Sequence, residues 1–187
     1  MPILNVFSLV LGITWRVYWY IKEKPANENK PKIKNKYIIL EKISICITSL
    51  FIASQLLGFT VFPFQNQIVN IFGFLLVLAG FAECMIARYN LSDNWANSYE
   101  YQIKKKHELI TSGIYAFVRH PIYGGMWLMG TGMLMVSGSN SVILFIPLVL
   151  VAINHLARRE EKLLTKHFGK KYLTYQKSSK KFIPFIY

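Results

Sequence analysis

The sequence predicts an all-α, polytopic membrane protein with about five transmembrane helices. Hydrophobic residues make up 53% of the 187 residues, and they are gathered in long blocks rather than spread evenly. The net charge is +13, and most of the basic residues stand between the apolar blocks. Several blocks approach the roughly 20 residues that an α-helix needs to cross a bilayer. These three observations favour a membrane protein over a soluble one.

Three apolar stretches make up the first half of the chain, residues 1–88. They are Pro2–Ile21, Tyr37–Phe62 and Ile68–Ala87, and each is long enough for one transmembrane helix. The third stretch contains Glu83, about one turn from its end. A carboxylate within a membrane helix is a functional candidate. A snorkelling side chain, or one paired with the nearby Arg88, is at least as good an interpretation.

The second half, residues 89–187, is expected to belong to the same single membrane domain as the first. Its apolar runs Pro121–Val136 and Ser141–Leu156 are short for full spans and predict a tight helical hairpin that only just crosses. The tail from Ala157 begins with a helical pattern and then loses its periodicity. Four glycines of the first run would permit close helix contact: Gly124, Gly125, Gly130 and Gly132.

The basic segments predict the orientation in the membrane. They are Lys22–Lys36, Arg88–Arg119 and the tail Ala157–Tyr187, whereas the two other turns carry no charge. Basic loops face the cytosol, so the N-terminus is predicted outside and the C-terminus inside. Binding of anionic lipid is a second interpretation of the same charges. Nucleic-acid binding is not expected, because the basic residues flank membrane segments and no reading motif is present.

The stretch His107–Gly125 combines histidine, arginine, tyrosine, proline and glycine at the mouth of an apolar run, as a site at a membrane boundary would. His107, Arg119 and His120 can hold an anionic group. Tyr115 and Tyr123 can stack on a flat ring and donate a hydroxyl. No metal-ligand spacing and no nucleophile triad stands out.

A second polar group follows the last apolar run, where Arg158 and Arg159 precede Glu160 and Glu161. Such a cluster at a helix end is either a solvated membrane anchor or one wall of a polar pocket closed by the tail. The residue types alone leave both interpretations open.

These motifs together resemble the isoprenylcysteine carboxyl methyltransferase family, and phospholipid N-methyltransferases share part of the pattern. The resemblance covers about half of the chain, from Leu91 to Pro184. The matching elements are L-I-T-S-G-I-Y at Leu109–Tyr115, R-H-P-I-Y-G at Arg119–Gly124, R-E-E at Arg159–Glu161, Leu164, F-G at Phe168–Gly169, and Tyr172 with Tyr175.

The resemblance implies an integral-membrane enzyme that uses S-adenosylmethionine and acts on a lipophilic or lipidated substrate. Residues 89–187 would be its catalytic half, and the tail from Ala157 would cap the cofactor pocket. The residues that it implies for cofactor binding are His107, Glu108, Leu109, Ile110, Tyr115, His120, Pro121, Ile122, Tyr123 and Glu160.

The acceptor is less well defined by the resemblance. The family places an arginine four residues before the glutamate that corresponds to Glu160, and this chain has Leu156 there. Arg158 and Arg159 lie nearby, and with Glu160 they are the expected catalytic residues, orienting the carboxylate of a prenylated cysteine or a similar lipid acid. The alternatives are methylation of a lipid amine, with Glu160 or His120 as proton acceptor, methylation of a thiol, and a non-enzymatic scaffold that binds anionic lipid.

Overall fold

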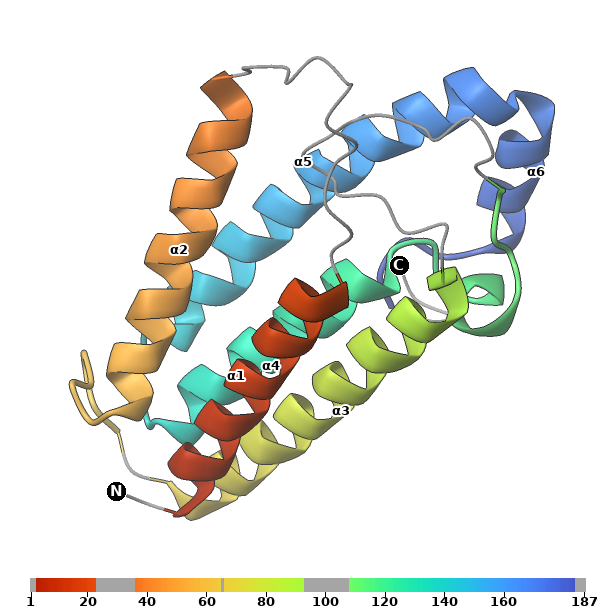
Figure 1. The fold of residues 1–187 in the computed structure, drawn as a ribbon. Helices are drawn as coiled ribbons and strands as arrows, with labels where there is room; N and C mark the ends of the chain where they lie inside the picture. The colour runs from red at the N-terminus through yellow and green to blue at the C-terminus, as the bar shows by residue number, and fades with distance from the viewer. Residues whose placement is uncertain (1–2, 23–35, 65, 93–107, 184–187) are drawn as a thin grey trace. The chain divides into compact units, whose positions relative to one another are not determined.

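The computed structural model describes residues 3–22, 36–64, 66–92 and 108–183. Across these residues the regular structure is helical, apart from two isolated β-bridges. The prediction of an all-α protein is therefore confirmed. The helices in Figure 1 are α1 (Ile3–Lys22), α2 (Lys36–Leu56), α3 (Gln67–Leu91), the 3₁₀ turn η2 (Gly113–Ala116), α4 (Pro121–Val136), α5 (Val142–Phe168) and α6 (Lys170–Ser178).

The chain forms two compact units. The first comprises Met1–Val77 with Gly130–Val142, and the second comprises Leu78–Met129 with Ile143–Tyr187. Both α3 and α4 contribute to both units. These units are defined by spatial contacts, whereas the predicted halves 1–88 and 89–187 are defined by function and stay a prediction.

The first unit is held by polar side chains that bind backbone groups at helix ends. The side-chain amide of Asn5 donates to the carbonyl oxygen of Leu56 at 3.1 Å. Gln55 is 1% exposed; its amide nitrogen donates to Phe59 O at 3.0 Å and its oxygen accepts from Val61 N at 2.8 Å. Backbone groups without helical partners at the end of α2 are thereby satisfied, as a dry environment requires.

Glycines let α3 and α4 approach closely. A Cβ atom added to Gly132 would lie 2.8 Å from Val77 N, and one added to Gly125 would lie 2.7 Å from both Gly80 O and Cys84 Sγ. No side chain larger than hydrogen fits at such a distance, which is the packing typical of membrane helices. The prediction of close contact is confirmed at Gly125 and Gly132.

Two described helices are long and apolar enough to cross a membrane. They are α3 and α5, whose most apolar 18-residue windows have mean hydropathies of 2.1 and 1.7. Only 22% and 11% of these windows are buried inside the protein. Large apolar side chains such as Leu75 on α3 and Leu148 on α5 point outward, exposed by 56% and 68%. An outward apolar surface suits lipid as the surrounding solvent.

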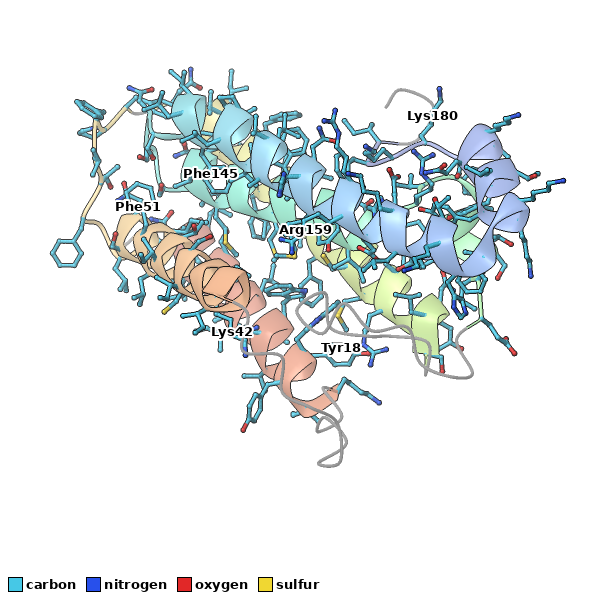
Figure 2. All side chains as sticks on the ribbon, turned by 90° about the horizontal axis from the view of Figure 1, so that it is seen from above. Tyr18, Lys42, Phe51, Phe145, Arg159 and Lys180 are labelled. Carbon is cyan, nitrogen blue, oxygen red and sulfur yellow. The ribbon has the colours of Figure 1, made fainter. Side chains whose placement is uncertain are left out.

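Helix α5 is longer than the apolar run Ser141–Leu156 predicts, because the helix continues through the charged residues that follow. It ends at Phe168, and Gly169 adopts a positive φ of 55° before α6 begins. Only glycine takes such a conformation without strain. Figure 2 shows that nitrogen-bearing side chains gather on α6 and on the end of α5 that leads into it.

The segment after α6 pairs with the segment that leads into α4. Lys180 N donates to Phe117 O at 2.9 Å, Arg119 N donates to Lys180 O at 2.8 Å, and His120 N donates to Lys181 O at 3.0 Å. Helix α4 begins directly afterwards at Pro121, as predicted, where proline's missing N–H is harmless. The tail is thus fixed beside the entry to α4, within the second unit.

Candidate active site

His120 lies at the centre of the polar contacts of the second unit. Its side chain is only 3% exposed. Nε2 is 3.2 Å from Oε1 of Glu161, and Nδ1 is 3.6 Å from Oε2 of Glu160. The ring also stacks on Tyr123, with 5.6 Å between ring centroids and 25° between planes. A single histidine therefore joins the start of α4 to two consecutive glutamates of α5.

Glu160 keeps part of its carboxylate open. Oε2 accepts a hydrogen bond of 3.2 Å from the Tyr123 hydroxyl and also faces His120, yet the side chain remains 42% exposed. The carboxylate is held in one place while some of its hydrogen-bonding capacity stays available. This combination suits recognition of a cationic or N–H-bearing ligand.

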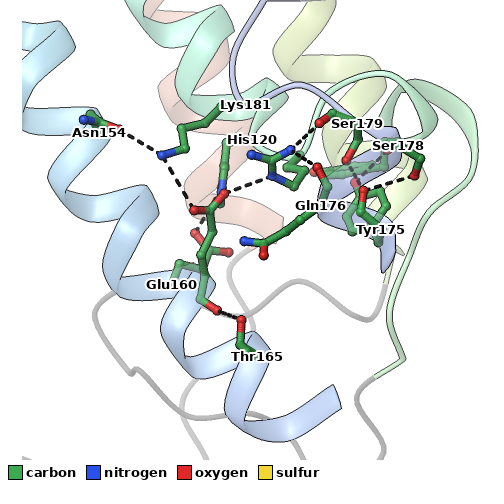
Figure 3. Close-up of polar contacts among 12 residues, drawn as sticks. His120, Asn154, Glu160, Thr165, Tyr175, Gln176, Ser178, Ser179 and Lys181 are labelled. Carbon is green, nitrogen blue, oxygen red and sulfur yellow. Dashed lines mark hydrogen bonds and ion pairs between the residues drawn. The ribbon is translucent and has the colours of Figure 1, made fainter. Parts of the chain in front are cut away.

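Glu161 is enclosed by three basic side chains. Its Oε1 is 2.9 Å from Arg119 Nε, in addition to its contact with His120, and Oε2 is 3.6 Å from Lys181 Nζ. Lys181 Nζ also donates to Oδ1 of Asn154 at 3.0 Å. Figure 3 shows these contacts converging from α5, the start of α4 and the tail. Glu161 thus anchors the tail.

Arg119 forms its hydrogen bonds with groups of the protein itself. Besides Glu161 it donates through Nη1 to the carbonyl oxygens of Gln176, at 3.1 Å, and of Ser179. These carbonyls end α6, where a cation is favourable. The expectation that Arg119 holds an anionic ligand is therefore not supported.

The electrostatic environment favours the charged form of His120. Burial alone would lower its pKa, but the hydrogen bonds and charges of Glu160 and Glu161 outweigh burial and raise the pKa above its usual value. Burial raises the pKa of Tyr175 to about 12, so its hydroxyl stays protonated. This hydroxyl donates to Tyr115 O at 2.6 Å and fixes η2 against α6.

A pocket of about 540 Å³ lies between the charged end of α5 and α6. Arg158 and Arg159 both line it, and Glu161 forms part of its wall. The other lining residues are His155, Lys162, Thr165 and Gln176. Basic groups outnumber carboxylates in this lining, so the pocket suits an anionic group.

The structure brings some of the predicted site residues together and separates others. His120, Tyr123 and Glu160 form one contact group, with the buried Pro121 and Ile122 in the same first turn of α4.

The other predicted site residues lie outside this contact group. Tyr115 is buried in η2, and the predicted stretch Glu108, Leu109 and Ile110 lies in the coil before it. Arg158 and Arg159 line the pocket instead. His107 lies outside the described residues.

Two residues that the sequence did not single out complete the site. Glu161 was named in the Arg/Glu cluster and in the R-E-E motif, but it was not chosen as a site residue. Lys181 lies in a segment without periodicity, so its contacts with Asn154 and Glu161 could not be predicted.

The chain was compared with known families and proteins. Residues 68–171 match the family described as phospholipid methyltransferase, and this stretch is more than half of the chain. The chain belongs to this family. The matched region contains the charged end of α5 and the whole contact group of His120, Tyr123 and Glu160, whereas the tail with Lys181 lies beyond it.

Individual relatives in this methyltransferase family point to one branch. The chain is 25% identical to the protein-S-isoprenylcysteine O-methyltransferase of Saccharomyces cerevisiae, over 97% of this chain and 80% of that protein. It is 31% identical to the enzyme of the same description from Xenopus laevis, over 68% of this chain but only 45% of that protein. With the human one it is 28% identical, over 86% of this chain and 58% of that protein. The resemblance stated from the motifs is confirmed.

A solved structure shares the fold. It is described as the eukaryotic intramembrane Ras methyltransferase ICMT (isoprenylcysteine carboxyl methyltransferase), and the match has a TM-score of 0.62, covering 100% of this chain and 69% of that one. At 20% identity the likeness concerns the fold alone. The shared fold and the two apolar helices α3 and α5 are the basis on which a location in the membrane is proposed below.

Proposed function

We propose that this phospholipid methyltransferase family member is an S-adenosylmethionine-dependent enzyme that methylates the carboxylate of a prenylated cysteine or a similar lipophilic acid. The observation that carries the proposal is the contact group of His120, Tyr123 and Glu160, which joins α4 to α5. The names of the relatives support the substrate class.

The residues of this group fit the methyl donor. S-Adenosylmethionine supplies an electrophilic methyl group on a positively charged sulfur. Glu160 is held by Tyr123 yet 42% exposed, so its carboxylate can accept hydrogen bonds from the N–H groups in the amino-acid part of S-adenosylmethionine. The stacked rings of His120 and Tyr123 offer an aromatic surface beside it.

The resemblance adds further cofactor contacts to the proposal. They are His107, Glu108, Leu109, Ile110, Tyr115, Pro121 and Ile122. Pro121 and Ile122 are buried in the first turn of α4, and Tyr115 is held by Tyr175. Their role would be to shape a dry cavity, in which positioning supplies much of the rate.

Arg158 and Arg159 would orient the acceptor. They line a pocket rich in basic groups, where a carboxylate can be bound. A carboxylate is already ionised at neutral pH and needs no general base. An amine acceptor would first have to lose a proton. The surroundings of His120 favour its protonated form, which makes it a poor proton acceptor, so Glu160 would have to take this proton.

The proposed arrangement in the membrane follows from the charges. Five helices cross the bilayer, the N-terminus is outside, and the tail and the site face the cytosol, where the basic segments belong. A soluble cofactor would enter from the cytosol, and a lipidated substrate from the bilayer. The tail, fixed by Lys181 and Arg119, would cover the cofactor.

The test is calorimetric binding of S-adenosylmethionine to detergent-purified protein, followed by methyl transfer to a prenylcysteine analogue. Glu160→Gln and Tyr123→Phe should weaken cofactor binding at least tenfold. Lys177→Gln, an exposed change on α6, serves as the control and should bind like wild type. A folded wild type that binds no cofactor would refute the proposal and favour a lipid-binding scaffold. Transfer to phosphatidylethanolamine instead would favour the amine alternative.

A further inference from the structure

Glu83 is an acidic residue of the second unit that the proposed mechanism leaves unused. It lies on α3, one of the two helices long and apolar enough to cross a membrane, and it is half-buried. A Cβ atom added to Gly124 would lie 3.3 Å from Glu83 Oε1 and 2.8 Å from Phe182 O. The carboxylate of Glu83 therefore lies against the first turn of α4, at the residue that follows Tyr123.

Nearby cations are engaged elsewhere. Lys181 contacts Asn154 and Glu161, and Arg88 donates through Nη1 to Ser92 O at 2.8 Å. Within the described part of the chain, Glu83 makes no hydrogen bond and no ion pair. The expectation that it pairs with Arg88 is therefore not met there. An ionisable group on a membrane helix is costly to keep and marks a functional position.

The two carboxylates beside α4 differ in what they can recognise. Glu160 has Tyr123 and His120 as hydrogen-bonding partners and an open edge for N–H groups. Glu83 has no such hydrogen-bonding partners among the described residues, and it lies on an apolar helix where charge is weakly screened. A sulfonium carries positive charge but has no hydrogen to donate, so a carboxylate recognises it by charge alone.

We propose that Glu83 is a further ligand-binding residue, which recognises the positive charge of the sulfonium in the methyl donor. The inference rests on the proposed function. When the methyl group moves to the acceptor oxygen, the carbon–sulfur bond breaks and sulfur keeps the electron pair. Sulfonium becomes neutral sulfide and carboxylate becomes neutral ester. Glu83 therefore binds S-adenosylmethionine in preference to S-adenosylhomocysteine, the product that remains after methyl transfer. This preference favours the replacement of bound product by a new molecule of S-adenosylmethionine.

This role predicts a particular kinetic pattern. Attraction to a charge that disappears during transfer stabilises the bound donor more than the transition state. Glu83→Gln should therefore raise KM for S-adenosylmethionine without lowering kcat. A residue that only supports the fold would lower both activity and thermal stability.

The decisive measurement is calorimetry on the cofactor-free protein with S-adenosylmethionine and with S-adenosylhomocysteine, which lacks the sulfonium charge. Glu83→Gln should weaken binding of the first at least tenfold and binding of the second less than twofold. Glu83→Asp keeps the charge at a greater distance, so the ratio of the two affinities should fall in the order wild type, Asp, Gln. The thermal unfolding midpoint of each variant verifies folding.

The possible failures are distinguishable. A ratio that does not depend on residue 83, or an equal loss for both ligands, would overturn the role of Glu83 and leave the proposed function intact. A folded wild type that binds neither ligand would remove the proposed function, and this inference with it. If Glu83→Gln does not fold, the ratio for Glu83→Asp decides.

Discussion

The charged end of α5 has two faces, which differ in how their charged side chains are surrounded. Toward α4 and the tail, Glu161 is 12% exposed and is enclosed by Arg119, His120 and Lys181. On the pocket side, Arg158 and Arg159 belong to a lining in which basic groups outnumber carboxylates. Enclosed, matched charges fix the architecture, because separating them is costly. The pocket side carries an excess of basic groups.

The enclosed face should be the more sensitive one, and Arg119→Met tests it most severely. The variant leaves Glu161 without its shortest ion pair and α6 without the cation at its carbonyl end. Removing one partner of a buried pair costs roughly 3–5 kcal/mol. We expect a large fall in the unfolding midpoint in detergent. Lys177→Met, on the exposed side of α6, should leave the midpoint unchanged; equal effects would erase the distinction between the faces.

The next effect depends on pH through His120. Its folded-state pKa is raised, so the folded protein binds a proton more readily than the unfolded chain does. The stabilisation is complete below the unfolded pKa of about 6.5 and is lost as pH rises through the folded-state pKa. The unfolding midpoint of wild type should therefore decline with rising pH across that window. His120→Gln should lack this component; an identical pH profile in both proteins would contradict it.

A smaller effect compares two buried tyrosines of α6. The hydroxyl of Tyr175 donates to Tyr115 O, whereas the buried hydroxyl of Tyr172 has no hydrogen-bond partner among the described residues. Tyr175→Phe should cost about 1 kcal/mol of unfolding free energy. Tyr172→Phe should be neutral or stabilising, since it removes an unpaired polar group. Chemical denaturation of both variants measures the difference, and a greater loss for Tyr172→Phe would reverse the interpretation.

The smallest effect on stability is expected on the pocket face. Arg158→Gln should leave the unfolding midpoint close to wild type, because Arg158 is exposed. If the pocket holds the acceptor carboxylate, KM for a prenylcysteine analogue should rise about tenfold, which corresponds to about 1.4 kcal/mol. Cofactor binding, measured by calorimetry, should not change. An unaltered KM would show that the pocket does not bind the acceptor carboxylate.

Much of the local structure could be predicted from the sequence. Apolar runs placed the helices and Pro121 marked the start of α4, because hydrophobicity and backbone restrictions act over a few neighbouring residues. The motifs also selected His120, Tyr123 and Glu160, which the structure brings together. The apolar run ended at Leu156, whereas α5 runs on to Phe168; the helical pattern that begins at Ala157 indicated a helix there, but not that the two segments form one continuous helix.

The pairing of charges was decided only by the tertiary structure. The motifs pointed to Glu160, but the sequence did not show which partners Glu161 would have or that Arg119 would be bound within the protein. In the fold, the bridge between Val118 and Lys180 brings the tail to α4 and encloses Glu161, while Glu160 stays partly open. The sequence by itself determined the helices, the family and the candidate residues, since these depend on local composition and motif. Which carboxylate is enclosed and which stays partly open depends on contacts between residues some 40 to 60 positions apart, which only packing can set.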